Sequence, residues 1–211
     1  MIALIDYGAG NLTSVKKALT SLGVEFVVPD TPDQCAGAAG LIVPGVGHFS
    51  ATKALDAPWR EAIGSAVRAG IPLLGICVGM QWLFGGSEEA PDVPGLGLLE
   101  GRCQLLRGDA ARRLKVPHVG WNALQPPRSQ QASAPNAFKG RLLAGLPSDT
   151  HVYFTHSFAA PVTGDCVAAS MHADCFAAAV ERDNVFGVQF HPEKSGDAGL
   201  QILRNFLKVC R

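Results

Sequence analysis

The segment Gly75-Ile76-Cys77-Val78-Gly79 is the first place in the sequence where residue type and spacing indicate chemistry. A nucleophile between two flanking glycines is typical of a sharp turn from a strand into a helix, which exposes the reactive side chain. A thiol at the start of a helix also meets the partial positive charge of the helix N-terminus, which favours the thiolate. The segment therefore predicts that Cys77 is a nucleophile, although a buried cysteine beside tightly packed glycines would give the same five residues.

A second candidate group is formed by His191 and Glu193, within the segment "GVQFHPEKS" from Gly187 to Ser195. A thiolate nucleophile needs a proton donor for its leaving group, and an imidazole can supply one. A spacing of two residues at the end of a strand can put both side chains on one side, where the carboxylate would orient the ring and stabilise its protonated form. An ordinary hydrogen-bonded histidine is the alternative for an isolated His-x-Glu pair.

A third segment, "VPGVGHF" from Val43 to Phe49, is rich in glycine and follows another apolar run. The glycines on either side of Val46 permit unusual backbone angles, so successive N–H groups can point at one place and form an oxyanion hole. Alone, the segment predicts only a turn. With Cys77 and His191 it completes a set suited to attack on a carbonyl carbon, stabilisation of the oxyanion, and protonation of an amine or ammonia leaving group.

The elements that must position these residues alternate between strand and helix in the first half of the chain. Strands are expected over residues 2–5, 24–28, 41–43 and 73–76, and helices over 12–22, 59–70 and from about residue 82. This alternation predicts a parallel sheet covered by helices on both faces. Active sites of open α/β sheets gather at the carboxyl ends of strands, which is where all three segments lie.

The second half changes to short strand candidates separated by turn residues, which predicts an antiparallel extension of the sheet. These candidates are residues 152–154, 166–170, 176–180 and 185–190, and the chain ends in an amphipathic helix for which Ser195 or Asp197 is the candidate cap. The polar, proline-rich stretch Gln125–Asn136 is expected to be a mobile loop. The basic segment Arg107–Lys115 is more typical of a solvated face or an interface rim than of a phosphate site.

Length and charge exclude several classes of protein. At 211 residues the chain fits one domain, residues 1–211, and its 18 basic and 18 acidic residues give a net charge of +0, unlike a nucleic-acid binder. The six cysteines are scattered without zinc-type spacing, so we expect no metal and no cofactor. No apolar run approaches the roughly 18 residues of a membrane span and no signal peptide is evident, so we expect no membrane association and a cytoplasmic location.

Six segments together resemble the class I, or triad, glutamine amidotransferases, and most closely the glutaminase subunits of imidazole glycerol phosphate synthases. They fall in that family's order and approximate spacing: "DYGAGN" (6–11), "PGVGHF" (44–49), "GICVGMQ" (75–81), "VPHVGWN" (116–122), "YFTHSF" (153–158) and "GVQFHPEKS" (187–195). The resemblance implies a three-layer α/β sandwich, whose central, mostly parallel sheet is flanked by helices and carries an antiparallel extension in the C-terminal half.

The resemblance also implies roles for individual residues. Cys77 would attack the side-chain amide of L-glutamine and form a γ-glutamyl thioester, with His191 as acid and base and Glu193 orienting it. The oxyanion and glutamine site would be built from Val46, Gly47, Val78, Gln81, Glu89, Ser157 and Phe158. Val78 stands where leucine is commoner in the family and Phe158 where tyrosine is frequent. Both positions are expected to act through their backbone, but a tyrosine hydroxyl contact would be missing.

A partner is implied as well, since ammonia released into water would be protonated and lost as a nucleophile. The partner would be a (β/α)₈ cyclase subunit that receives ammonia through a tunnel. Its two products would be imidazole glycerol phosphate and a purine precursor. Its contact segments match His118, Trp121, Asn122 and Lys194 in this chain. By sequence alone, Trp121 would more often be a core or surface aromatic. A solvated surface carboxylate is an equally good interpretation of Glu89.

Three other functions remain open on the sequence. Gly8-Ala9-Gly10 after the first strand suggests a dinucleotide-binding turn, but Thr13 stands where that fingerprint needs its third glycine. A different amidotransferase or a thiol hydrolase of similar fold would share most of the motifs, although "PHVGWN" argues against it. A catalytically silent interaction subunit should have lost Cys77, His191 or Glu193, and all three are present.

Overall fold

A central sheet organises the computed structural model, which describes residues 1–9, 12–127 and 138–210. In spatial order its seven strands are β2 (Phe26–Val27), β1 (Ile2–Leu4), β3 (Gly40–Gly45), β4 (Leu73–Cys77), β11 (Val185–Val188), β10 (Asp174–Arg182) and β9 (Cys166–His172). Strands β2 to β11 in this order are parallel, whereas β10 and β9 are antiparallel additions at the edge. The predicted mostly parallel sheet with an antiparallel extension is confirmed.

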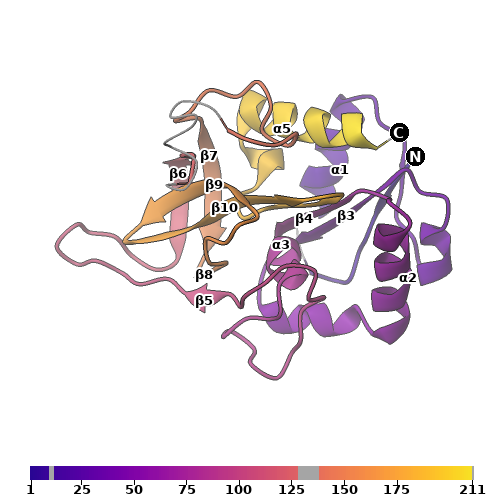
Figure 1. Cartoon of the computed structure of the whole chain (residues 1–211), viewed down its shortest axis with the longest axis horizontal. Coiled ribbons are helices and arrows are strands. Elements are labelled where there is room, and N and C mark those ends of the chain that lie inside the picture. The colour runs from indigo at the N-terminus through magenta and orange to yellow at the C-terminus, as the bar shows by residue number, and fades with distance from the viewer. Residues whose placement is uncertain (10–11, 128–137, 211) are drawn as a thin grey trace.

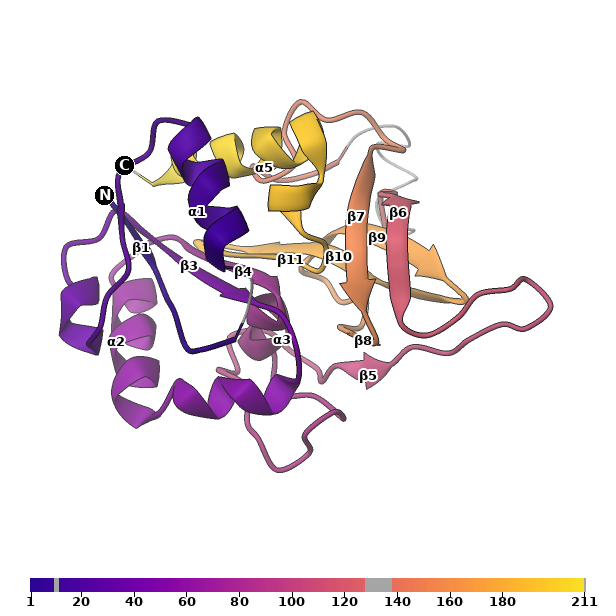
Figure 2. The same cartoon turned by 180° about the vertical axis from the view of Figure 1, so that it is seen from behind.

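Helices form a layer on each face of this sheet, as Figure 1 and Figure 2 show. On one face lie α1 (Leu12–Ser21) and α5 (Gly196–Val209), and on the other α2 (Ala57–Arg68) and α3 (Val78–Leu83). The 3₁₀ helices are η1 (Pro32–Cys35), η2 (Phe49–Ala54) and η3 (Pro192–Lys194). Every residue of β3 and β4 is buried, as expected for parallel strands covered on both faces. No helix in the described ranges is long and apolar enough to cross a membrane.

Two small antiparallel sheets lie beside the large one. Strand β6 (His118–Ala123) pairs with β7 (His151–His156), and β5 (Gln104–Leu105) pairs with β8 (Phe158–Ala159). Figure 2 shows β6 and β7 standing across the end of the large sheet, with the segment between β5 and β6 projecting beyond them. Strands β5, β6 and β8 were not predicted, because two-residue strands have no period and β6 mixes glycine with polar residues.

Some sequence predictions fall partly outside the described residues. Gly10 and Asn11 of "DYGAGN" do so, as do residues 128–136 of the predicted loop. At the start of that loop, the backbone of Gln125 pairs with that of Ala169 in β9, the edge strand of the large sheet. Strand β2 is shorter than the predicted 24–28 because it lies at the sheet edge and pairs only with β1.

The register of the sheet brings three strand ends together. Gly45 lies opposite Cys77, and Val188 lies opposite Ile76, so β3, β4 and β11 end side by side. The segments that follow them are the three that sequence patterns single out. This placement follows from the parallel order and is the one that a shared active site needs.

Candidate active site

Cys77 lies at the turn between β4 and α3 and has a strained backbone. Its φ of 53° and ψ of −108° are angles that a non-glycine residue rarely adopts. The neighbouring glycines make the turn possible: a Cβ at Gly75 would lie 2.6 Å from the Gly79 carbonyl oxygen, and a Cβ at Gly79 would collide with the Val43 carbonyl. The structure therefore has the strand-to-helix turn that the glycine spacing predicts, and close packing holds the thiol at its tip.

His191 follows β11 and is oriented by a carboxylate. Its Nδ1 lies 2.8 Å from Glu193 Oε1, and the two side chains are only 1% and 2% exposed. The backbone of His191 is also fixed, because its N–H donates to the Tyr153 carbonyl at 2.9 Å and its carbonyl accepts from the Ser195 hydroxyl at 2.6 Å. Ser195 thus occupies the predicted N-cap position of α5, but its hydroxyl serves His191 rather than the helix.

The electrostatic surroundings raise the pKa of His191 to about 10. Burial acts in the opposite direction, because it disfavours the charged ring, but the Cys77 thiolate and then the Glu193 carboxylate outweigh it. Nδ1 is engaged by Glu193, whereas the buried Nε2 faces the Cys77 thiol and has no other hydrogen-bond partner within the described part of the chain. Nε2 is therefore the ring nitrogen available to exchange protons with a group bound at the sulfur.

The thiol lines a small cavity of about 30 Å³. Its walls are formed by Gly47, Cys77, Val78, Gln81, Glu89, Thr155, His156, Ser157 and Phe158. A single water needs about 10–15 Å³ of accessible volume. The cavity therefore holds roughly two waters, which is less space than a glutamine side chain needs. The accessible space beside the sulfur is therefore small in this structure.

Six of the seven residues predicted to hold glutamine line this cavity, namely Gly47, Val78, Gln81, Glu89, Ser157 and Phe158. Val46 is the exception, since it is 37% exposed and does not form part of the wall. Gln81 donates from Nε2 to the Phe158 carbonyl at 2.8 Å, and Glu89 Oε2 accepts from the backbone N–H of Phe49 at 2.7 Å. These polar groups are thus oriented before any ligand binds. Their role in binding glutamine remains a prediction.

Two contacts to the sulfur come from residues that sequence analysis did not single out. Gln189, a fully buried side chain, donates from Nε2 to Cys77 Sγ at 3.6 Å, and Thr155 places its carbonyl oxygen 3.9 Å from the same sulfur. The signal for Gln189 is its position two residues before His191, where a buried amide must find partners. Thr155 contributes only its backbone, so no side-chain pattern could identify it.

The residues predicted to face a partner divide into exposed and buried ones. Trp121 is 56% exposed, its ring centroid lies 6.1 Å from that of Tyr153, and Lys194 Nζ lies 5.9 Å from the same tyrosine ring. These side chains share one surface beside β6 and β7. His118 is only 4% exposed, and its Nε2 lies 3.3 Å from Asn122 Nδ2. In this structure, His118 is therefore placed beneath that surface rather than on it.

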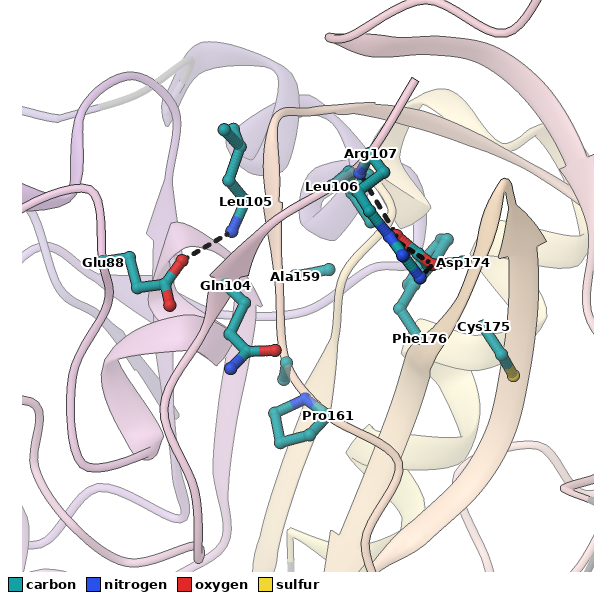
Figure 3. A pocket seen from close by; sticks show the side chains of 11 residues that line it. Glu88, Gln104, Leu105, Leu106, Arg107, Ala159, Pro161, Asp174, Cys175 and Phe176 are labelled. Carbon is teal, nitrogen blue, oxygen red and sulfur yellow. Dashed lines mark hydrogen bonds and ion pairs between the residues drawn. The ribbon is translucent and has the colours of Figure 1, made fainter. Parts of the chain in front are cut away.

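A larger hollow of about 440 Å³ lies beside the β5–β8 pair and is drawn in Figure 3. Its charged groups are already paired: Arg107 forms an ion pair with Asp174, and Glu88 accepts from the backbone N–H of Leu105 at 3.2 Å. Neither the nucleophile nor the histidine–glutamate pair lines it. The smaller cavity is the candidate active site because it contains the Cys77 thiol, which interacts with the ring of His191.

Comparison with known proteins gives consistent matches along the whole chain. A family model described as "Glutamine amidotransferase class-I" matches residues 3–210. A relative from Moorella thermoacetica named "Imidazole glycerol phosphate synthase subunit HisH" is 42% identical over 216 residues, covering 100% of this chain and 95% of the relative. One of the same name from Geobacillus thermodenitrificans is 45% identical and covers 99% and 96%. The solved structure described as "Crystal structure of glutamine amidotransferase" has a TM-score of 0.73 at 21% identity, covering 100% and 99%, a likeness of fold.

Proposed function

This chain belongs to the class-I glutamine amidotransferase family, and from that premise we propose that it is the glutaminase subunit of an imidazole glycerol phosphate synthase. It would hydrolyse L-glutamine and deliver the ammonia to a cyclase subunit in histidine biosynthesis. The observation that carries the proposal is the placement of Cys77 on its strained turn next to the buried His191–Glu193 pair.

The first half-reaction forms a thioester. The Cys77 thiolate attacks the side-chain amide carbon of glutamine and gives a tetrahedral oxyanion. The C–N bond then breaks while His191 Nε2 donates its proton to the departing nitrogen, which leaves as ammonia. The raised pKa of His191 suits this step, because the ring is protonated at neutral pH before the leaving group needs the proton.

The second half-reaction consumes the thioester. The neutral ring left after ammonia departs takes a proton from water, and the resulting hydroxide attacks the thioester carbonyl. The C–S bond breaks, glutamate leaves, and the proton on His191 again faces the Cys77 thiolate. Glu193 keeps Nδ1 protonated throughout, so Nε2 carries out both transfers.

Recognition of glutamine would use the walls of the cavity. Backbone groups of Val46, Gly47 and Val78 are assigned to the oxyanion, and the Glu89 carboxylate to the substrate ammonium. Gln81, Ser157 and Phe158 would hold the remainder of the substrate. The accessible volume beside the sulfur is only about 30 Å³, so we expect the walls to move when glutamine binds, and partner docking can favour that movement.

The partner would be a (β/α)₈ cyclase that covers the surface around Trp121, with Asn122, Lys194 and His118 at or below the contact. A sealed path between the two subunits keeps ammonia away from water, where protonation would remove its nucleophilic lone pair. The cyclase would combine it with a ribulosyl aminoimidazole carboxamide nucleotide to give imidazole glycerol phosphate and a purine precursor. The free cysteines of this chain support a reducing, cytoplasmic setting.

The decisive experiment combines the purified chain with its cyclase and the nucleotide, and measures glutamate and imidazole product. Cys77→Ala is expected to reduce glutamate release by about 10⁴-fold or more. Cys175→Ala is the matched control, since that thiol is exposed and lies outside the cavity. Unchanged turnover in Cys77→Ala would refute the mechanism. A wild-type chain that the cyclase does not stimulate would refute the subunit assignment.

A further inference from the structure

A line of hydrogen bonds leads inward from the exposed β6–β7 pair. Asn122 Nδ2 lies 3.3 Å from His118 Nε2, and His118 Nδ1 lies 3.1 Å from His156 Nε2. His156 Nδ1 in turn lies 3.0 Å from the Phe158 carbonyl oxygen. Both histidines are buried, at 4% and 6% exposure, so water does not compete for these contacts.

The same line continues to the nucleophile. The Phe158 carbonyl also accepts from Gln81 Nε2 at 2.8 Å, and Gln81 Nε2 lies 3.1 Å from Gln189 Oε1. Gln189 Nε2 then donates to Cys77 Sγ at 3.6 Å. An unbroken series of polar contacts therefore joins Asn122, beside the proposed partner surface, to the reactive sulfur.

The outer end of the line has a fixed direction. The Asn122 amide can be oriented in only one way, because its Nδ2 also donates to the Met171 carbonyl at 2.9 Å and its Oδ1 accepts from the Ala123 N–H at 2.8 Å. Nδ2 is thus a donor toward His118, and His118 Nε2 must accept. That leaves the proton of a neutral His118 on Nδ1.

The inner end gives the same assignment independently. The Phe158 carbonyl can only accept, so His156 Nδ1 must carry a proton, and Nε2 of a neutral His156 accepts from His118 Nδ1. Each contact then has one donor and one acceptor, with both rings neutral. A proton added to either Nε2 would set two donors against each other.

Burial favours these neutral rings. It lowers the pKa of His118 to about 4, helped by His172, whose ring stacks on it at 4.2 Å. It lowers the pKa of His156 to about 3, with smaller effects of His118, His172 and His191 in the same direction, while the bond to the Phe158 carbonyl opposes the shift. The line is thus complete at neutral pH.

We propose that Asn122, His118 and His156 are positioning residues for the nucleophile. They fix the Phe158 carbonyl, which orients Gln81 and Gln189, and Gln189 then holds its donor against the Cys77 sulfur. A shift of β6 on partner docking would thereby reach the thiol through hydrogen bonds. This proposal deepens the proposed function and rests on it for its catalytic consequence, but not for the contacts themselves.

Simple packing is the competing explanation, because His118 and His156 also contact Phe154 and Phe176 within one aromatic cluster. Packing needs the shape of the rings but is indifferent to which nitrogen carries the proton. The proposal, in contrast, requires both histidines to be protonated on Nδ1. Free neutral histidine favours Nε2 protonation, so the required form is the less common one.

The first test is ¹⁵N NMR of the wild-type full chain labelled at histidine, at neutral pH. We expect Nδ1–H tautomers for His118 and His156, and an Nε2–H tautomer for His172, whose Nε2 lies 2.7 Å from the Lys115 carbonyl oxygen. His156→Phe and His172→Phe identify the signals. Nε2–H tautomers or charged rings at 118 or 156 in the wild-type chain would overturn the proposal.

The second test follows alkylation of Cys77 against pH, by mass spectrometry of its peptide. In His156→Phe and in Gln189→Leu, loss of the donor at sulfur should move the midpoint of the profile upward by about half a pH unit or more. His172→Phe is the matched control and should leave it unchanged, because that ring lies in the same cluster but outside the line. If packing of the cluster were the cause, His172→Phe would move the midpoint as much as His156→Phe does. An unmoved midpoint in Gln189→Leu would overturn the proposal.

Turnover in the complex with the cyclase completes the test. His156→Phe should reduce kcat about tenfold, and His172→Phe less than about twofold. If the wild-type chain released no glutamate, the proposed function would fail, while the tautomers and the alkylation profile would still decide whether the line exists.

Discussion

The two sides of the active site are held in place by different means. On the nucleophile side, the backbone positions the reactive group, because the tight packing of Gly75 and Gly79 holds Cys77 at a positive φ. On the base side, polar side chains position it, since Glu193 orients the His191 ring and Ser195 holds its backbone. Substitutions on the nucleophile side should therefore lower the stability of the fold, whereas substitutions on the base side should alter the protonation of His191 and the reaction rate.

The largest effect is expected from Gly79→Ala, which tests the backbone side. Its Cβ would collide with the Val43 carbonyl, and neither strand nor turn can yield, so we expect a loss of about 4 kcal/mol or more in unfolding free energy. Gly64→Ala in α2 is the matched control: its Cβ would meet only the flexible end of Arg68 at 3.2 Å, so stability should change by about 1 kcal/mol or less. Urea unfolding measures both, and equal costs would show that the turn tolerates a side chain.

Glu193→Gln tests the polar side and should leave the fold largely intact. The amide can present its NH₂ group to Nδ1 and stabilise the wrong tautomer, so glutamate release should fall by about 10²–10⁴-fold. Glu88→Gln is the control, because that carboxylate lies in the other hollow and an amide oxygen can still accept from the Leu105 N–H. Near wild-type turnover in Glu193→Gln would mean that something other than the carboxylate orients the ring.

The same division explains which parts could be predicted from the sequence. The turn at Cys77 and the His191–Glu193 pair are local patterns, and the parallel strand order follows from the alternation of strands and helices. Strand β6 could not be foreseen, because its regular structure comes from pairing with β7, which begins 28 residues after β6 ends (151 − 123). The position of Gln189 near His191 is a weak signal, but its contact with Cys77, 112 residues away, could not be assigned from the sequence. The same holds for the contact between His156 and His118, which are 38 residues apart.

The sequence is also limited in what it says about side-chain direction. It predicts one group of partner-facing residues, namely Trp121, Asn122, His118 and Lys194. A motif match gives the segments but not the direction of each side chain. Alternation along β6 puts Trp121 outward at 56% exposure and His118 inward at 4%, which emerges only once the strand is seen. His118, together with Asn122, also belongs to the line of hydrogen bonds that leads toward the sulfur.

The smallest expected effect is a pH dependence that separates the two sides of the active site. The stability contributed by the His191–Glu193 pair should depend on pH, whereas that of the turn at Cys77 should not. The folded-state pKa of His191 is raised to about 10, above the ordinary value of 6.5, so its stabilisation is complete below pH 6.5 and is lost as pH rises through about 10. The destabilisation caused by Glu193→Gln should accordingly be largest near pH 7, at about 1–2 kcal/mol, and shrink toward pH 10. The cost of Gly79→Ala, being steric, should stay constant across that range, and urea unfolding at several pH values compares the two. A Glu193→Gln cost that grew with pH would mean that the carboxylate stabilises the neutral ring and not the imidazolium.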